Sequence, residues 1–232
     1  MEQFVTSNVI PFLSCDGAHG LDHFIAVRNH AILAVANRED LTAEQKESII
    51  VAAFLHDVDD VKLTNNKKPL YHNSWLEYTI DELQLSNKDE IIKMVDLVSC
   101  SKWGDRKDSI SPDWYYIPRY CDRLEAIGKG GVARCIDFSL SRNRPMSLPE
   151  TKIARSLEEL AEIVTPERYD SYTIGSKGVY PVTTLDHFYD KLLHIKLPSW
   201  LENEYLRGEF ESKRYYKEEW VIGYWNLFQG AD

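Results

Sequence analysis

VAAFLHDVDD, the sequence of residues 51–60, runs from a strongly apolar segment into a histidine, His56, and an aspartate, Asp57. Thr42 and Gln45, ahead of the segment, have the spacing of a capping box, which predicts that a helix begins just after Thr42. Because the segment is apolar on all sides, the helix should be buried. The helix would then end where core meets solvent, with two side chains that can bind a metal. A His-Asp step alone is more often a surface or capping pair, so the step needs support from elsewhere in the chain.

Helical spacing continues on both sides of this segment. Apolar residues at helical intervals, together with capping signals such as Ser86 or Asn87, predict further helices at residues 20–37, 72–84, 88–99, 120–138, 150–164, 184–195 and 199–226. The Gly-rich interruption at 128–131 indicates a kink or the close approach of another backbone. Turn formers predict loops at residues 62–70, 101–118, 141–149 and 165–182, of which 101–118 has the length of an active-site lid. No convincing set of strands is present, so we expect an all-α chain.

Composition limits the class of protein. The 232 residues carry 27 basic and 37 acidic side chains, a net charge of −10, with 44% hydrophobic residues, which is ordinary for a soluble folded protein. We expect one domain over residues 1–232, a helical bundle with long connecting loops. The acidic balance argues against nucleic acid as a partner. The four cysteines are scattered, which favours reduced thiols in a cytoplasmic protein. We also find no apolar run near the roughly 18 residues of a membrane span and no signal peptide, so we expect no membrane partner.

Two other regions offer metal-binding groups. His23 lies in the helix predicted at 20–37, and His19 precedes it by one turn on the same face. Asp122 stands among apolar residues in RYCDRLEAIG, where burying a carboxylate is costly unless it binds a cation or a hydrogen-bond donor. A salt bridge to Arg119 or Arg123 is the alternative explanation for Asp122.

The order of these groups, a histidine, then a His-Asp pair, then an aspartate, resembles the HD-domain superfamily of metal-dependent phosphohydrolases. The matching segments are HGLDHFIAV (19–27), AAFLHDVDD (52–60), RYCDRLEAIGKGGVARC (119–135) and DHFYDKLLHIK (186–196). The last two are similar to a bacterial branch of small, stand-alone members. Four segments in the right order are much more specific than any one of them.

The resemblance implies that the metal ligands are His23, His56, Asp57 and Asp122. Two imidazoles with two carboxylates suit one divalent transition ion such as Mn²⁺, Fe²⁺, Co²⁺, Ni²⁺ or Zn²⁺. In two places the chain departs from the family pattern: Ala26 stands where an arginine is usual, and residues 99–101 read Ser-Cys-Ser where the bacterial branch often has His-Ser. Because that histidine is a candidate extra ligand in relatives with two metals, we expect a single ion.

Proton transfer and substrate binding need further residues. Asp60 follows His56 by four residues, on the same face if the helix persists, and occupies the position of a catalytic acidic residue in related nucleotidases, so we prefer it to Asp59. His19 would contact the phosphate or water, or support His23. In the last segment, Lys191 and His187 are the expected substrate-binding residues, since a lysine there would neutralise phosphate charge.

The sequence therefore predicts a phosphohydrolase that acts on a nucleotide or another small phosphate ester with water activated by a metal. The alternatives are an HD-fold oxygenase and a nucleotide sensor without catalysis. The expected partner is a small phosphorylated substrate. The C-terminal aromatic residues are expected to pack in the core or to form a homo-oligomer contact rather than to bind a ligand; they are Trp200, Tyr205, Phe210, Trp220 and Trp225.

Overall fold

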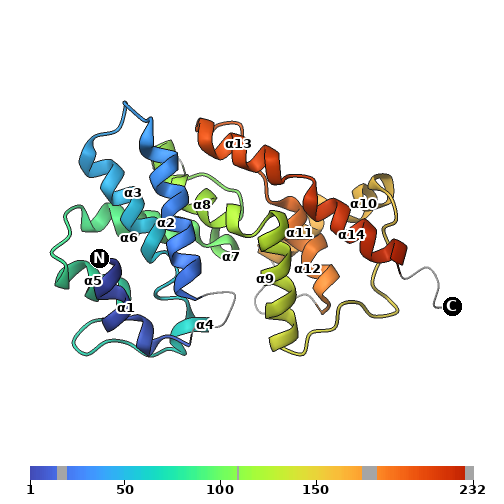
Figure 1. Ribbon diagram of the computed structural model, residues 1–232, viewed down its shortest axis with the longest axis horizontal. Coiled ribbons are helices and arrows are strands. Elements are labelled where there is room, and N and C mark those ends of the chain that lie inside the picture. The colour runs from blue at the N-terminus through green and yellow to red at the C-terminus, as the bar shows by residue number, and fades with distance from the viewer. Residues whose placement is uncertain (15–19, 109, 174–181, 228–232) are drawn as a thin grey trace. The chain divides into compact units, whose positions relative to one another are not determined.

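The computed structural model describes residues 1–14, 20–108, 110–173 and 182–227, and within these ranges every regular element is a helix (Figure 1). The predicted all-α class is confirmed. The chain divides into two compact units. Unit 1 comprises Met1–Ser99, Asp108–Asp122 and Ser199–Leu206, and unit 2 comprises Cys100–Lys107, Arg123–Pro198 and Arg207–Asp232. That the whole chain folds as one domain stays a prediction.

In the part of the chain that is described, no helix has both the length and the apolar character to traverse a bilayer.

Unit 1 is built around α2 and α3, which lie side by side in Figure 1. α3 also packs against α6, and α6 packs against α5 and η2. The elements of this unit are α1 (Glu2–Asn8), η1 (Ile10–Phe12), α2 (Leu21–Ala36), α3 (Ala43–Leu55), α4 (Val61–Thr64), α5 (Trp75–Glu82), α6 (Lys88–Val98), η2 (Asp113–Tyr116) and most of α8 (Ile117–Glu125).

The α3 helix confirms the central sequence prediction. Its capping box is complete, with Gln45 N–H bonded to Thr42 Oγ1 at 3.2 Å and Thr42 N–H bonded to Gln45 Oε1 at 2.9 Å. Every residue from Val51 to Leu55 is buried, and Phe54 meets Phe24 of α2 edge to face with ring centres 6.3 Å apart. Burial of each such aromatic side chain contributes about 2 to 3 kcal/mol. This packing fixes the C-terminal end of α3 beside α2.

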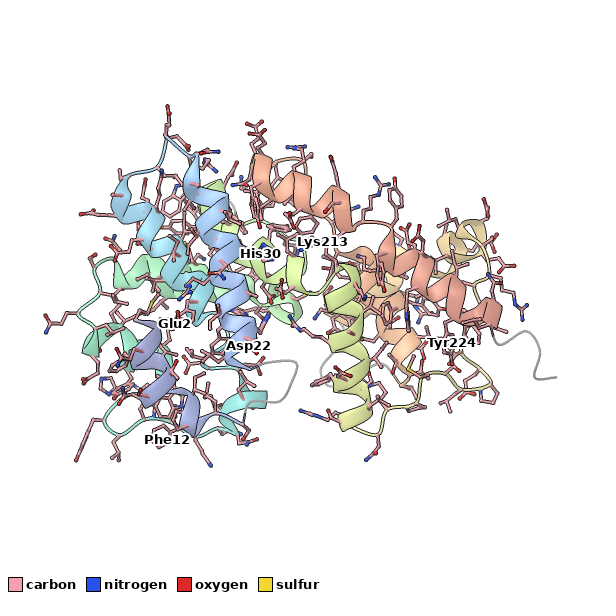
Figure 2. The ribbon with its side chains drawn as sticks, viewed as in Figure 1. Glu2, Phe12, Asp22, His30, Lys213 and Tyr224 are labelled. Atoms are coloured by element: carbon pink, nitrogen blue, oxygen red, sulfur yellow. The ribbon has the colours of Figure 1, made fainter. Side chains whose placement is uncertain are left out.

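Unit 2 is organised around α14, which packs against α9, α10 and α12. Trp220 of α14 stacks on Phe188 with ring centres 4.9 Å apart. Trp225 Nε1 donates a hydrogen bond to Tyr189 Oη at 2.8 Å. The hydroxyl of Tyr224, which is labelled in Figure 2, lies 3.1 Å from Ser147 Oγ. Its other elements are α7 (Cys100–Trp103), α9 (Gly128–Ser141), α10 (Leu157–Ile163), α11 (Pro166–Thr173), α12 (Thr184–Asp190), η3 (Leu192–His194), the end of α8, most of α13 (Glu204–Lys213), and α14 (Tyr216–Leu227) itself. Of the C-terminal aromatics in this unit, Phe210 and Trp225 are buried in the core, whereas Trp220 and Tyr224 are half-buried.

Two cationic side chains in unit 2, Arg168 and Lys217, donate hydrogen bonds to oxygen atoms of the protein. Arg168 donates from Nε to Asp190 at 2.6 Å and from Nη2 to Asp186 at 3.0 Å. The buried Lys217 ammonium donates to the carbonyl oxygens of Leu192 at 2.5 Å and Ile195 at 3.3 Å. Burial lowers the pKa of Lys217 to about 8.

Two predicted helices begin or break elsewhere. The helix predicted over 120–138 is interrupted before the glycine run, at residues 126–127, and the run itself forms the first turn of α9. Gly128 has a positive φ of 71°, and a Cβ on Gly131 would overlap the Ala126 carbonyl carbon, which confirms the close backbone approach. The helix predicted from residue 150 begins only at Leu157, because Thr151 Oγ1 accepts the Leu148 N–H at 2.9 Å in a local turn.

The predicted loops contain short helices. Residues 62–70 include the end of α4, and residues 101–118 include most of α7 and all of η2. The 165–182 loop prediction is wrong for Pro166–Thr173, which form α11, while residues 174–181 lie outside the described part of the chain. Pro166 at the first helical position was the missed start signal. The helix predicted over 199–226 is two helices, α13 and α14.

Candidate metal centre

His56 occupies the C-cap of α3, with helical backbone angles, and its ring is held from one side. Nδ1 lies 2.9 Å from the carbonyl oxygen of Ala53, one turn back. Because a carbonyl oxygen only accepts, Nδ1 carries the proton and Nε2 presents a lone pair. This buried Nε2 faces carboxylate oxygens, Asp57 Oδ2 at 3.3 Å and Asp122 Oδ1 at 3.6 Å. Since a carboxylate cannot donate a hydrogen, a proton or a metal ion must complete the arrangement.

His23 joins the same cluster from the first turns of α2. Its Nε2 lies 3.3 Å from Asp122 Oδ1 and 3.9 Å from Asp57 Oδ2, and its ring centre lies 5.1 Å from that of His56. One ligand atom from each of His23, His56 and Asp122 lies within 4.8 Å of the others. Ligand atoms about 2.0 to 2.2 Å from a common metal lie roughly 3 to 4 Å apart. The cluster can therefore hold a metal ion.

The charges in the cluster favour a bound cation. Burial lowers the pKa of His56, but the Asp57 and Asp122 carboxylates outweigh it and hold this pKa well above its usual value. Burial raises the pKa of Asp122, but hydrogen bonds and charge from His23 and His56 bring it well below its usual value. The two carboxylates thus attract positive charge to the imidazoles. A metal ion there would compete with a proton.

The arginines near Asp122 have other partners. Arg119 Nε donates to the carbonyl oxygen of Leu97 at 2.6 Å, and Arg123 donates to the Asp105 carboxylate and the Gly104 carbonyl oxygen. Both guanidinium groups are buried. Asp122 itself lies against two imidazoles, with Oδ1 3.3 Å from His23 Nε2 and 3.6 Å from His56 Nε2.

The two aspartates after Asp57 differ in their surroundings. The helical-face argument for Asp60 fails because α3 ends at Leu55, and the Asp60 N–H bonds the carbonyl oxygen of Asp57 in a turn at 3.0 Å. Asp59, however, accepts the backbone N–H groups of Trp75 at 2.7 Å and Leu76 at 3.3 Å. Burial raises the pKa of Asp59, and these two bonds oppose the rise only in part. Asp59 is engaged with backbone, so Asp60 remains the candidate acid or base.

Arg28 and His30, which the sequence did not assign to the site, have partners outside the cluster. His19 falls outside the described residues. Arg28, near the missing family arginine, does not take its place, because its guanidinium pairs with Glu2 at 2.5 Å and lies over the Phe54 ring. His30 packs on Tyr205, with Nδ1 2.6 Å from the hydroxyl; Glu2 and His30 are both labelled in Figure 2.

Lys191 and His187 belong to unit 2. The Lys191 ammonium lies 5.9 Å from the centre of the Tyr172 ring, and the His187 ring centre lies 5.8 Å from it. Their role in binding substrate stays a prediction.

Sequence reasoning missed the contacts of Asp59 and Asp108. Asp108, in the predicted lid, accepts the Ser111 N–H at 2.6 Å and pairs with Lys93 at 2.8 Å. These contacts lower the pKa of Asp108, the Lys93 hydrogen bond most strongly. The Asp108-Ser111 spacing signals such a turn, whereas nothing in the sequence signals the pairing with Lys93. This part of the predicted lid is thus tied to α6.

Two solved structures of other proteins show which fold this chain has. The chain is similar to an HD-superfamily hydrolase from Bacillus thuringiensis, with a TM-score of 0.59 and 18% identity over 99% of this chain and 95% of that one. It is also similar to Bacillus subtilis YpgQ, solved in complex with ADP, with a TM-score of 0.59 and 16% identity over 99% of this chain and 95% of that one. The chain therefore has the HD-superfamily fold, as the sequence resemblance implied.

A relative in sequence comes from a virus. Uncharacterized protein L803 of Acanthamoeba polyphaga mimivirus is 37% identical over 219 residues, which are 89% of this chain and 88% of L803. The chain belongs to the family of L803. No protein-family model matches the chain.

Proposed function

We propose that this protein is a metal-dependent phosphohydrolase that acts on a nucleotide or another small phosphate ester. The observation that carries the proposal is the buried cluster in which the imidazoles of His23 and His56 meet the carboxylates of Asp57 and Asp122. A nucleotide is favoured because YpgQ, a protein of the same fold, was solved with ADP. We expect a cytoplasmic enzyme without nucleic-acid partners, and self-association remains an expectation of the sequence.

The cluster residues would hold one divalent transition ion. Such an ion, when bound, activates water and neutralises charge that develops on a phosphoryl group. The bond from His56 Nδ1 to Ala53 fixes the ring and its tautomer, so that Nε2 is available as a ligand. Asp57 and Asp122 supply negative charge to compensate the ion.

Hydrolysis forms a bond from water oxygen to phosphorus and breaks the bond to the leaving oxygen, so a proton must leave the water and another must reach the leaving group. Asp60 is the proposed acid or base for this exchange, and His19 would support the water or phosphate. Lys191 and His187 would bind phosphate charge.

The test combines metal analysis with a screen for phosphate release. Protein purified without chelator should contain a transition metal and should release phosphate or pyrophosphate from at least one nucleotide or sugar phosphate. The His56→Ala variant, purified in parallel, is the control and should do neither. Metal with an oxygen-dependent spectrum and no phosphate release would favour an oxygenase, and nucleotide binding without turnover would favour a sensor; either result contradicts the proposal.

A further inference from the structure

The turn after α3 carries two of the four cluster residues, His56 and Asp57. α3 ends at Leu55, and the turn contains a bond from Val58 N–H to the Leu55 carbonyl oxygen at 3.2 Å and one from Asp60 N–H to the Asp57 carbonyl oxygen at 3.0 Å. These bonds are internal to the segment. They do not tie His56 and Asp57 to any other element.

Asp59 connects the turn of residues 56–60 to α5. Its two carboxylate oxygens accept the N–H groups of Trp75 and Leu76, the first two residues of the helix. N–H groups in a first helical turn have no partner within the helix, and the partial positive charge there favours a carboxylate. The contact satisfies two backbone donors and the half-buried Asp59 carboxylate together.

The anchor on α5 is itself well fixed. Trp75 is only 4% exposed, its ring stacks on Phe12 with centres 5.1 Å apart, and its Nε1 donates to the carbonyl oxygen of Lys67 at 3.1 Å. A second cap, in which Ser74 Oγ accepts the Glu77 N–H at 3.0 Å, holds the same helix end. Asp59 therefore joins the turn of residues 56–60 to the first turn of α5.

We propose that Asp59 is a positioning residue that fixes the turn of residues 56–60 so that His56 and Asp57 present their ligand atoms to one metal ion. This inference rests on the metal site of the proposed function. With the turn held, His56 Nε2 and Asp57 Oδ2 lie 3.3 Å apart, with Asp122 Oδ1 3.6 Å from the same nitrogen. Loss of residues that orient ligands lowers metal affinity by about 10- to 100-fold.

Titration with Co²⁺, followed by its visible absorption, tests the proposal without any substrate. Asp59→Ala should weaken Co²⁺ binding by about tenfold or more and should change the spectrum, because the ligands are less well oriented. Asp59→Asn keeps the shape and one accepting oxygen, so its affinity should fall between those of wild type and Asp59→Ala. Ser156→Ala, which removes a comparable helix cap from α10 in unit 2, is the matched control and should leave affinity and spectrum unchanged.

Wild-type affinity and spectrum in a folded Asp59→Ala variant would overturn the proposal. If Asp59→Ala does not fold, Asp59→Asn decides: weaker Co²⁺ binding supports the positioning role, and wild-type binding overturns it. Absence of Co²⁺ binding by the wild type would overturn both this inference and the metal site. Co²⁺ binding by the wild type without phosphate release would contradict only the proposed reaction.

Discussion

Arg168 and Lys217 of unit 2 differ from the cluster of unit 1 in how their charge is balanced. In unit 2, Arg168 bonds two carboxylates and Lys217 bonds two carbonyl oxygens, so each cation is balanced by groups of the protein. In unit 1, the buried Nε2 of His56 faces Asp57 and Asp122, which only accept hydrogen bonds. The first arrangement is complete as folded, whereas the second is completed by a proton or by a metal ion. Substitutions of Arg168 or Lys217 should therefore affect stability, and those in the cluster should affect metal binding.

The largest expected effect comes from the ligands. His56→Ala or Asp57→Ala should abolish metal binding and all phosphate release, because each removes one of the four proposed ligands. Elemental analysis measures the first and a phosphate assay the second. Circular dichroism must show that the variants fold. Full metal occupancy in a folded variant would refute the assignment of that residue.

Asp60→Asn separates proton transfer from metal binding. The variant should retain its metal, but its turnover rate should fall by a factor of about 10² or more, because a positioned acid or base contributes about that much to the rate. Steady-state rates with metal content measured on the same sample check this. Near-normal turnover would show that Asp60 is a surface carboxylate.

Arg168→Met tests the other side of the comparison. Loss of its bonds to Asp186 and Asp190 should lower the free energy of unfolding by about 2 kcal/mol, the usual size for hydrogen bonds to charged groups. Urea unfolding measures the loss. Metal content should not change, and a variant that lost its metal while folded would contradict the division between the two kinds of buried charge.

The smallest expected effect concerns Lys191. Lys191→Met has nearly the same length without the charge, and it should raise KM for a phosphate substrate about tenfold, or about 1.4 kcal/mol, with unchanged metal content. A charge that holds the substrate without joining the chemical step acts mainly through binding. An unaltered KM for every active phosphate substrate would remove Lys191 from the site.

The fold was predictable where local signals agree with burial. The capping box at Thr42 and the apolar run up to Leu55 locate α3 almost to the residue, because the cap and the core select the same helix. The start of α10 was not predictable from helical spacing, since a side-chain bond from Thr151 to backbone competes with the helix. Likewise the break before Gly128 depends on backbone packing around Gly131.

The candidate site was predictable as a set of residues but not as a geometry. The order of His23, the His-Asp pair and Asp122 pointed to four residues, and the structure brings their side chains together. That they bind a metal stays a prediction. The surroundings of Asp59 and Asp60 were not predictable, because they depend on where α3 ends and on the contact of Asp59 with α5, which involves residues 16 and 17 positions away. The role of Asp60 as acid or base stays a prediction. Such long-range contacts leave no local pattern in the sequence.

Metal stoichiometry is the most direct test of the account. Wild-type protein purified without chelator and reconstituted with Co²⁺ or Mn²⁺ should hold about one ion per chain, and folded His56→Ala should hold none. Absence of stoichiometric metal in the wild type, or equal metal in both proteins, would contradict the claim that the His23, His56, Asp57 and Asp122 cluster is completed by a cation.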